Sequence, residues 1–174
     1  MKIVHVIEPF ASGVAFFVKS LAEMMPGDTH FIVHGERKEV MSAVEVKKLF
    51  PRQNVRFVRW KSANRSINPV KDLMALRELY TILRRFKEKS LVDVVHLHSS
   101  KSGFLGRLAC KVAGINNVIY TPHGASFLSG KNFLVKKIYR QLEKLGSSLG
   151  GKIVCCSESE FEAFRGNRNK SHLY

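Results

Sequence analysis

Residues 93–127, which read DVVHLHSSKSGFLGRLACKVAGINNVIYTPHGASF, decide the fold. They begin with a short apolar run, continue with helical periodicity over 103–113, and close with a β-branched and aromatic run over 117–121. This order of strand, helix and strand predicts a βαβ unit. The polar loops 99–102 and 122–126 follow the two strands. Because open parallel sheets bind ligands at the carboxyl ends of their strands, the stretch also predicts a ligand site.

The rest of the chain repeats this alternation. Six apolar runs are separated by helical patterns, at residues 2–7, 30–34, 55–60, 92–98, 117–121 and 152–157. The runs are apolar throughout, as expected for parallel strands that are covered on both faces. We therefore expect an α/β fold with a Rossmann-like, doubly wound parallel sheet of about six strands and helices on both faces. One domain over 1–164 fits the length, and the polar stretch 165–174 is expected to be a frayed tail.

The expected helix ends carry familiar signals. Ser12 precedes a helix from Gly13 to Met25 and is a suitable N-cap. The helix that starts at Gly103 is expected to stop at Gly114, a suitable C′ glycine.

Charge is the most unusual bulk property of the chain. Lys and Arg total 29 against 14 Asp and Glu, which gives a formal net charge of +15. Nucleic acid, anionic lipid headgroups and phosphorylated substrates are all suitable counterparts. Two expected helices, 69–90 and 131–147, combine basic residues with an apolar stripe, and an anionic membrane surface is the favoured partner. The expected stripes contain Leu73, Leu76, Leu79, Tyr80, Leu83 and Phe86 in the first helix and Leu134, Ile138, Leu142 and Leu145 in the second.

Other partners and locations are less favoured. The sequence has no RNA-recognition or helix-turn-helix signature, so we expect no nucleic-acid binding. No apolar run approaches the roughly 18 residues of a membrane span, and the amino terminus enters a strand directly. A cytoplasmic protein, peripheral on the inner face of the membrane, is expected. The three cysteines form no CxxC pair and are expected to be reduced thiols.

The loop after the first strand contains Ser12 and Gly13. A glycine at a helix start lets phosphate approach backbone N–H groups at the positive end of the helix dipole. A purely structural glycine is the alternative. Neither GxGxxG nor GxxxxGK[ST] occurs, which disfavours a dinucleotide-binding fingerprint and a P-loop.

The loop after the strand at 92–98 offers Ser99, Ser100 and Lys101, which can hold an anion or a sugar. Alternatively, one serine caps the helix and Lys101 is solvated. His96 and His98 lie on the same side of their strand, because side chains alternate along a strand. We expect His98 to line the site and His96 to lie in the core. No HExxH or CxxC spacing supplies further ligands, so no metal is expected.

His123 is the strongest single candidate for chemistry. It stands between Pro122 and Gly124 just after a strand, so its imidazole can be presented at the ligand edge. It can accept a proton, donate a hydrogen bond to a sugar hydroxyl, or neutralise phosphate. A histidine that only holds its own loop is the alternative.

The stretch 93–127, together with SGVAFFVKSLAEMM after the first strand and KIVCCSESE near the end, resembles the amino-terminal domain of family 4 GT-B glycosyltransferases. The resemblance implies two Rossmann-like domains that face each other across a cleft. The amino-terminal domain mainly binds the acceptor, and the carboxyl-terminal domain binds the nucleotide sugar. It also implies transfer with retention of configuration, without a catalytic metal or other cofactor.

The resemblance further implies roles for individual residues. Ser12 and Gly13 would approach the donor diphosphate, and His123 would lie by the transferred sugar as the catalytic candidate. Relatives often have paired glycines where this chain has Ser12-Gly13. The residues expected to bind the acceptor or sugar are His98, Ser99, Ser100, Lys101, Gly124, Ser157 and Glu158.

The favoured hypothesis is therefore the amino-terminal domain of a retaining glycosyltransferase that acts on a lipid-linked glycan in bacterial surface polysaccharide synthesis. The sequence has no second domain with the paired glutamates that bind the donor, so this domain is not expected to be active alone and would need a donor domain in cis or in trans. A non-catalytic acceptor- or membrane-binding subunit of a split glycosyltransferase is the alternative. An NAD(P)-binding Rossmann protein is less favoured.

Overall fold

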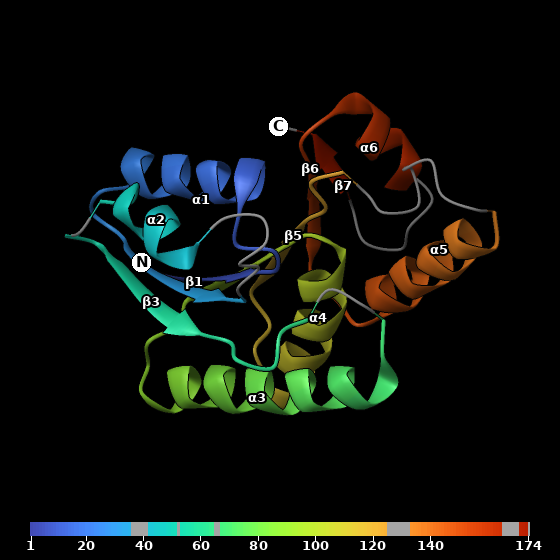
Figure 1. Cartoon of the computed structure of the whole chain (residues 1–174), viewed down its shortest axis with the longest axis horizontal. Coiled ribbons are helices and arrows are strands. Elements are labelled where there is room, and N and C mark those ends of the chain that lie inside the picture. The colour runs from blue at the N-terminus through green and yellow to red at the C-terminus, as the bar shows by residue number, and fades with distance from the viewer. Residues whose placement is uncertain (36–41, 52, 65–66, 125–132, 165–170, 174) are drawn as a thin grey trace.

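The computed structural model describes residues 1–35, 42–51, 53–64, 67–124, 133–164 and 171–173. It contains a parallel sheet whose strands follow the order β3-β2-β1-β4-β5-β6-β7 (Figure 1). The strands are β1 Lys2–Ile7, β2 Thr29–His34, β3 Val55–Arg59, β4 Val94–His98, β5 Val118–Thr121, β6 Lys152–Cys155 and β7 Ser171–Leu173. The order reverses between β1 and β4, which are direct neighbours. This reversal is the topological switch point at which doubly wound sheets bind ligands.

The expected Rossmann-like α/β fold is confirmed, and all six expected strands are present. A seventh strand was not expected: residues 171–173 pair in parallel with β6, whereas the sequence predicts a frayed tail over 165–174. The reason is local, since the outer edge of β6 has backbone groups that a short extended segment can satisfy. The rest of that tail lies outside the described residues.

Helices cover both faces of the sheet (Figure 1). The helices α1 Ser12–Met24 and α2 Ala43–Lys48 pack on one face with Ile7, Phe10 and Ile32. The opposite face is covered by α3 Pro69–Glu88 and α4 Ser100–Ala113, and α5 Phe133–Ser148 packs against α4. A further helix, α6 Glu158–Phe164, follows β6.

Two helix starts differ from the prediction. Ala11 rather than Ser12 is the N-cap of α1, and no side chain caps it. Ser12 has a φ of 53°, so it lacks the extended backbone that a capping serine needs. Helix α4 begins at Ser100 and contains Gly103, where an added Cβ would lie 2.2 Å from Tyr120 Cε2. Gly114 ends α4 with a φ of 67°, as expected.

The apolar stripe of α3 is only partly buried. Ala75, Leu79, Leu83 and Phe86 form its buried face. Leu73 lies two residues before buried Ala75, which is about 200° of rotation around the helix. It points to the opposite side of α3 and is 67% exposed. Leu73 therefore belongs to an exposed part of the expected stripe.

Two residues of the expected apolar stripe of α5 face solvent. Ile138 and Leu145 are more than half exposed, whereas Glu143 and Ser147 are buried. The buried contacts of Glu143 with α4 and β5 fix this rotation. Among the helices of the described residues, none is long and apolar enough to cross a bilayer.

Candidate functional site

The loops that follow β1, β4, β5 and β6 meet at the carboxyl edge of the sheet, and we call them together the carboxyl-edge site. Three of these loops have a non-glycine residue in the left-handed region: Ser12 with φ 53°, Ser99 with φ 71° and His123 with φ 52°. Such residues cost about 1–3 kcal/mol each and gather at ligand sites. Three such residues at adjacent loops are typical of a ligand site, whereas the opposite edge has one described residue of this kind, Ser90 with φ 51°.

Ser12 and Gly13 are exposed at the amino terminus of α1. Nothing lies within 4 Å of a Cβ added at Gly13, so a ligand has room to approach the first turn. Unsatisfied N–H groups at a helix start favour an anion. The position suits the predicted phosphate loop, which stays a prediction.

The loop after β4 is tied to the start of α3. Lys101 Nζ lies 2.6 Å from Asp72 Oδ1 and 2.9 Å from Asn64 Oδ1. The lysine is therefore an ion-paired, largely buried group rather than a solvated one. Ser99 and Ser100 are partly exposed beside it, as a surface for an acceptor requires.

His98 does not line the site as predicted, because its side chain is fully buried. Its Nδ1 lies 3.0 Å from His123 Nε2, so it lies behind His123 rather than in contact with a substrate. His96 is buried as expected, and its Nε2 lies 2.8 Å from Thr121 Oγ1.

His123 itself is half-buried at the site. The ring of Phe17, from α1, meets its imidazole edge-on with ring centroids 4.8 Å apart. Its Nδ1 lies 3.8 Å from the Sγ of exposed Cys156. Desolvation lowers the pKa of His123, and Glu160 opposes this shift. The imidazole is therefore neutral at pH 7, which disfavours the predicted role of a cation that neutralises phosphate.

A cluster of buried histidines continues behind His123. His5 Nδ1 lies 3.2 Å from His98 Nε2, and His5 Nε2 lies 3.0 Å from His30 Nδ1. Desolvation lowers the pKa values of His5 and His98 well below their usual range and that of His96 to about 3. All three rings are consequently neutral.

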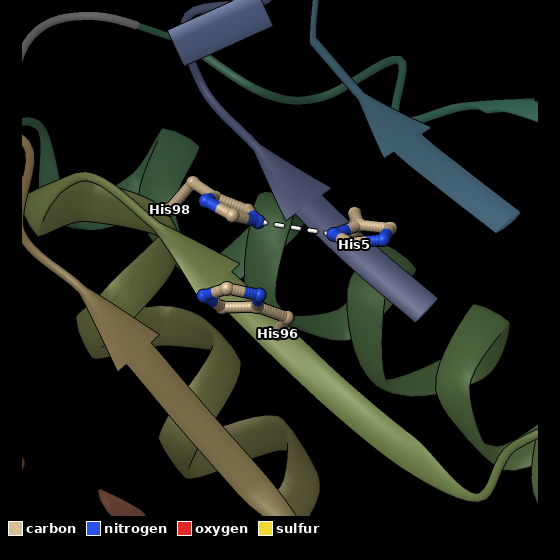
Figure 2. Close-up of side chains that lie close together, drawn as sticks. All are labelled: His5, His96 and His98. Atoms are coloured by element: carbon tan, nitrogen blue, oxygen red, sulfur yellow. Dashed lines mark hydrogen bonds between the residues drawn. The ribbon is translucent and has the colours of Figure 1, made fainter. Parts of the chain in front are cut away.

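His5, His96 and His98 are also a candidate set of metal ligands. Their candidate ligand nitrogens lie within 4.8 Å of one another. In Figure 2, however, the facing nitrogens of His5 and His98 are already joined by a hydrogen bond, and the ring of His96 lies alongside them. The rings of His96 and His98 are 4.0 Å apart, with an interplanar angle of 36°. An ion would have to break this hydrogen bond and turn His96 away from its contact with His98, so the geometry fits neutral, hydrogen-bonded imidazoles better.

The loop after β6 carries Ser157 and Glu158, both exposed at the start of α6. Ser157 Oγ accepts a hydrogen bond from Glu160 N at 3.3 Å, so the serine caps the helix. Glu158 remains a candidate ligand for a sugar hydroxyl.

Sequence reasoning missed the residues that hold the site together. Glu160 is buried; one carboxylate oxygen accepts a hydrogen bond from Gly124 N and the other from Cys156 N. This carboxylate joins the loops after β5 and β6. The sequence signal for Glu160 was its position two residues after the candidate Glu158, in the segment that follows the same strand. His5 and His30 were also missed, and their signal was a histidine inside each of two buried strands.

The order of the sheet and the loops at its carboxyl edge define one Rossmann-like half of a GT-B fold. The family model named Glycosyltransferase Family 4 matches residues 11–172, and the chain belongs to that family.

Two curated relatives come from bacteria. An Escherichia coli UDP-Gal:alpha-D-GlcNAc-diphosphoundecaprenol alpha-1,3-galactosyltransferase is 40% identical over 98 residues, which cover 56% of this chain and 24% of the relative. A Klebsiella pneumoniae uncharacterized 41.2 kDa protein in the cps region is 28% identical over 167 residues, 93% of this chain and 42% of the relative. The chain thus matches less than half the length of each.

Solved structures with the same fold share little sequence. Sucrose-phosphate synthase from Thermosynechococcus elongatus is similar with a TM-score of 0.65 at 15% identity, over 99% of this chain and 47% of that one. MurG from Acinetobacter baumannii is similar with a TM-score of 0.58 at 16% identity, over 90% of this chain and 41% of that one. A UDP-N-acetylglucosamine 2-epimerase from Rickettsia bellii is similar with a TM-score of 0.62 at 12% identity, over 99% of this chain and 44% of that one. Because an epimerase shares the fold, the fold alone does not specify transfer.

Proposed function

We propose that this chain is the acceptor-side half of a retaining glycosyltransferase. It acts with a donor-binding domain, in cis or in trans, to move a sugar from a nucleotide sugar to a diphospholipid-linked glycan in bacterial surface polysaccharide synthesis. No catalytic metal or other cofactor takes part. The observation that carries the proposal is the set of three left-handed residues, Ser12, Ser99 and His123, at adjacent loops of a family 4 domain. The Escherichia coli relative, whose name gives a diphosphoundecaprenol acceptor, supports the choice of substrate class.

Each part of the carboxyl-edge site has a task in this reaction. The open amino terminus of α1 at Ser12 and Gly13 receives the donor diphosphate through backbone N–H groups. Ser99, Ser100 and Glu158 offer hydroxyl and carboxylate groups to the acceptor. His123 meets the transferred sugar with a neutral imidazole, which hydrogen-bonds a hydroxyl group.

The acceptor half of this proposal can be tested on the chain directly. We expect the chain to bind a GlcNAc-diphospholipid in detergent micelles at least about tenfold more tightly than the same lipid without the sugar, because sugar hydroxyls add hydrogen bonds. Calorimetry gives both affinities. Equal affinities would contradict acceptor recognition by this domain.

The catalytic half needs the protein with its donor-binding domain. His123→Ala should lower transfer from the nucleotide sugar by at least about tenfold, since one hydrogen bond to the sugar is lost. Transfer is measured by chromatography of the extended lipid-linked product. Unchanged turnover would remove His123 from the reaction. Full transfer by this chain alone would contradict the need for a second domain.

Two exposed surfaces fit a membrane that carries such a lipid. On α5, Ile138 and Leu145 are exposed beside Lys137 and Lys144. The start of α3 adds a second apolar surface, with Ile67, Val70, Leu73 and Met74 more than half exposed. Each cation near an anionic leaflet contributes about 1 kcal/mol, and the apolar side chains add area that can be buried in the interface.

Vesicle co-sedimentation tests this membrane contact. The double variant Lys137→Glu/Lys144→Glu should bind vesicles containing anionic phospholipid at least about tenfold more weakly. The matched control is Lys48→Glu/Arg59→Glu, which changes the charge equally at exposed positions of α2 and β3, far from α5 in Figure 1. Equal losses in both variants would show a general charge effect and contradict a specific membrane face.

A further inference from the structure

Five residues form a continuous hydrogen-bonded chain from the inside of the domain to the carboxyl-edge site. It runs from the Met25 carbonyl through His30, His5 and His98 to His123. The successive distances are 3.3 Å, 3.0 Å, 3.2 Å and 3.0 Å. Every link after the first joins the Nδ1 of one imidazole to the Nε2 of another. We call His30, His5 and His98 the histidine relay.

The Met25 carbonyl gives this chain a direction. A carbonyl oxygen only accepts hydrogen bonds, so His30 Nε2 must carry the proton that it donates to Met25. A neutral imidazole has one N–H, so His30 Nδ1 must accept from His5 Nε2. Because neutral His5 carries its proton on Nε2, its Nδ1 must accept a hydrogen bond, and His98 Nε2 donates it. At the end of the chain, His123 Nε2 donates to His98 Nδ1.

The reverse direction would leave an unprotonated His30 Nε2 facing the Met25 carbonyl, so that two acceptors would oppose each other. The surroundings also keep His5 and His98 neutral, as the argument requires, because both rings are fully buried. His96, whose ring is tilted against that of His98, is also buried. His123 faces the carboxylate of Glu160 and the thiol of Cys156.

We infer that His30, His5 and His98 are positioning residues that hold His123 as its Nε2–H tautomer, so that His123 Nδ1 faces the site as a hydrogen-bond acceptor. That nitrogen lies on the side of exposed Cys156. An acceptor nitrogen selects a ligand group that carries a proton, and a sugar hydroxyl does. It would repel an unprotonated phosphate oxygen. The inference thus deepens the proposed function by assigning His123 to the sugar rather than to the diphosphate, and it rests on that function for the identity of the ligand.

The tautomer can be read without substrate or activity. Long-range 15N–1H correlations of the imidazole rings in the labelled chain at pH 7 report which nitrogen of His123 carries the proton. We expect the Nε2–H form in at least about tenfold excess, since one net hydrogen bond separates the two forms. A predominant Nδ1–H form in the unsubstituted chain would overturn the inference, even if the chain takes part in sugar transfer.

Substitutions at His98 separate positioning from mere packing. His98→Asn keeps an amide oxygen that can accept from His123 Nε2, and it should keep the Nε2–H tautomer. His98→Leu fills similar space without an acceptor, and the Nδ1–H form should then become detectable. The Nε2–H excess persisting unchanged in His98→Leu would contradict the role of His98.

The distant end of the relay gives a second, independent test, which holds even if His98→Leu does not fold. His30→Phe removes the anchor at Met25 without touching His123, and the Nδ1–H form of His123 should increase. Thr121→Val is the matched control, because Thr121 bonds only to His96 among the histidines and lies outside the relay. A change in Thr121→Val and none in His30→Phe would contradict the relay.

Discussion

Both faces of the sheet pack apolar side chains, but at strands β1, β2 and β4 they differ in chemistry. Under α3 and α4 the strands present Val4, Val6 and Val95 to helix residues such as Leu79 and Leu83. Under α1 the neighbouring positions of the same strands are His5, His30, His96 and His98, all buried. Because side chains alternate along a strand, a single strand such as β1 supplies both kinds of surface.

This difference indicates that the aliphatic surface mainly stabilises the domain, whereas the imidazole surface orients residues of the candidate site. Aliphatic packing is non-directional and tolerates small shifts, whereas hydrogen-bonded imidazoles fix orientation. The imidazole face reaches the carboxyl-edge site through His123, and the aliphatic face does not. Three predictions use this contrast, from the largest expected effect to the smallest.

The largest effect is expected at the one buried ion pair described on the aliphatic side. Arg107 Nη2 lies 3.0 Å from Glu143 Oε2, and Tyr120 Oη donates to Glu143 Oε1 at 2.7 Å. Glu143→Leu leaves the Arg107 charge buried without its partner and should lower the free energy of unfolding by about 3–5 kcal/mol. Urea denaturation measures the change.

The double variant Glu143→Leu/Arg107→Met removes both charges and should recover much of the lost stability. If it is no more stable than Glu143→Leu alone, the loss comes from packing rather than from an unpaired charge.

An intermediate effect is expected from Thr121→Val on the imidazole side. The substitution leaves buried His96 Nε2 without its hydrogen-bond partner at nearly constant volume. The free energy of unfolding should fall by about 1–3 kcal/mol. Thermal denaturation at pH 7 provides the measurement, and no loss would mean that His96 finds another partner.

Per pH unit, the smallest effect is a change in the slope of stability against pH. The native pKa of His96 is lowered to about 3, while an unfolded histidine titrates near its usual 6.5. Between these values the unfolded state binds more protons, so stability is present above pH 6.5 and is lost as pH falls toward 3. Each such histidine contributes a slope of about 1.4 kcal/mol per pH unit. His96→Leu should remove that contribution in urea denaturation at pH 4–7.

Leu79→Ala is the control from the aliphatic face. It should cost about 2–5 kcal/mol at every pH without altering the slope. Equal slopes in His96→Leu and the unsubstituted chain would show that His96 is not held neutral by burial.

Much of the fold could be predicted because the strands are apolar throughout and are separated by helical patterns and polar loops. Residues 93–127 predicted the βαβ unit, which the structure places at the switch point, and the loops that follow its strands lie at the carboxyl edge, as predicted. The helix faces were predicted less well. In α5 the hydrophobic period points outward, because the buried pairing of Glu143 with Arg107 overrides it.

The site was only partly predictable for a related reason. His123 stands out by its Pro and Gly neighbours, but its partners come from strands that are distant in sequence: His5 is 93 residues from His98, and His98 is 25 from His123. Only the register that places β1 beside β4 brings them together. The link from Glu160 to Gly124 likewise depends on tertiary contact.

The central claim is that sugar diphosphate ligands bind at the carboxyl edge of the sheet. Its most direct test is an NMR titration of the 15N-labelled chain with a GlcNAc-diphospholipid analogue. The account predicts that shifted amide signals gather at the acceptor side of the edge, at Ser99–Ser102, Gly124 and Cys156–Glu158. A cavity of about 240 Å³ lined by Ile115, Val118 and Gly150 lies at the opposite, amino edge. Shifts confined to that cavity, or none at all, would contradict the account.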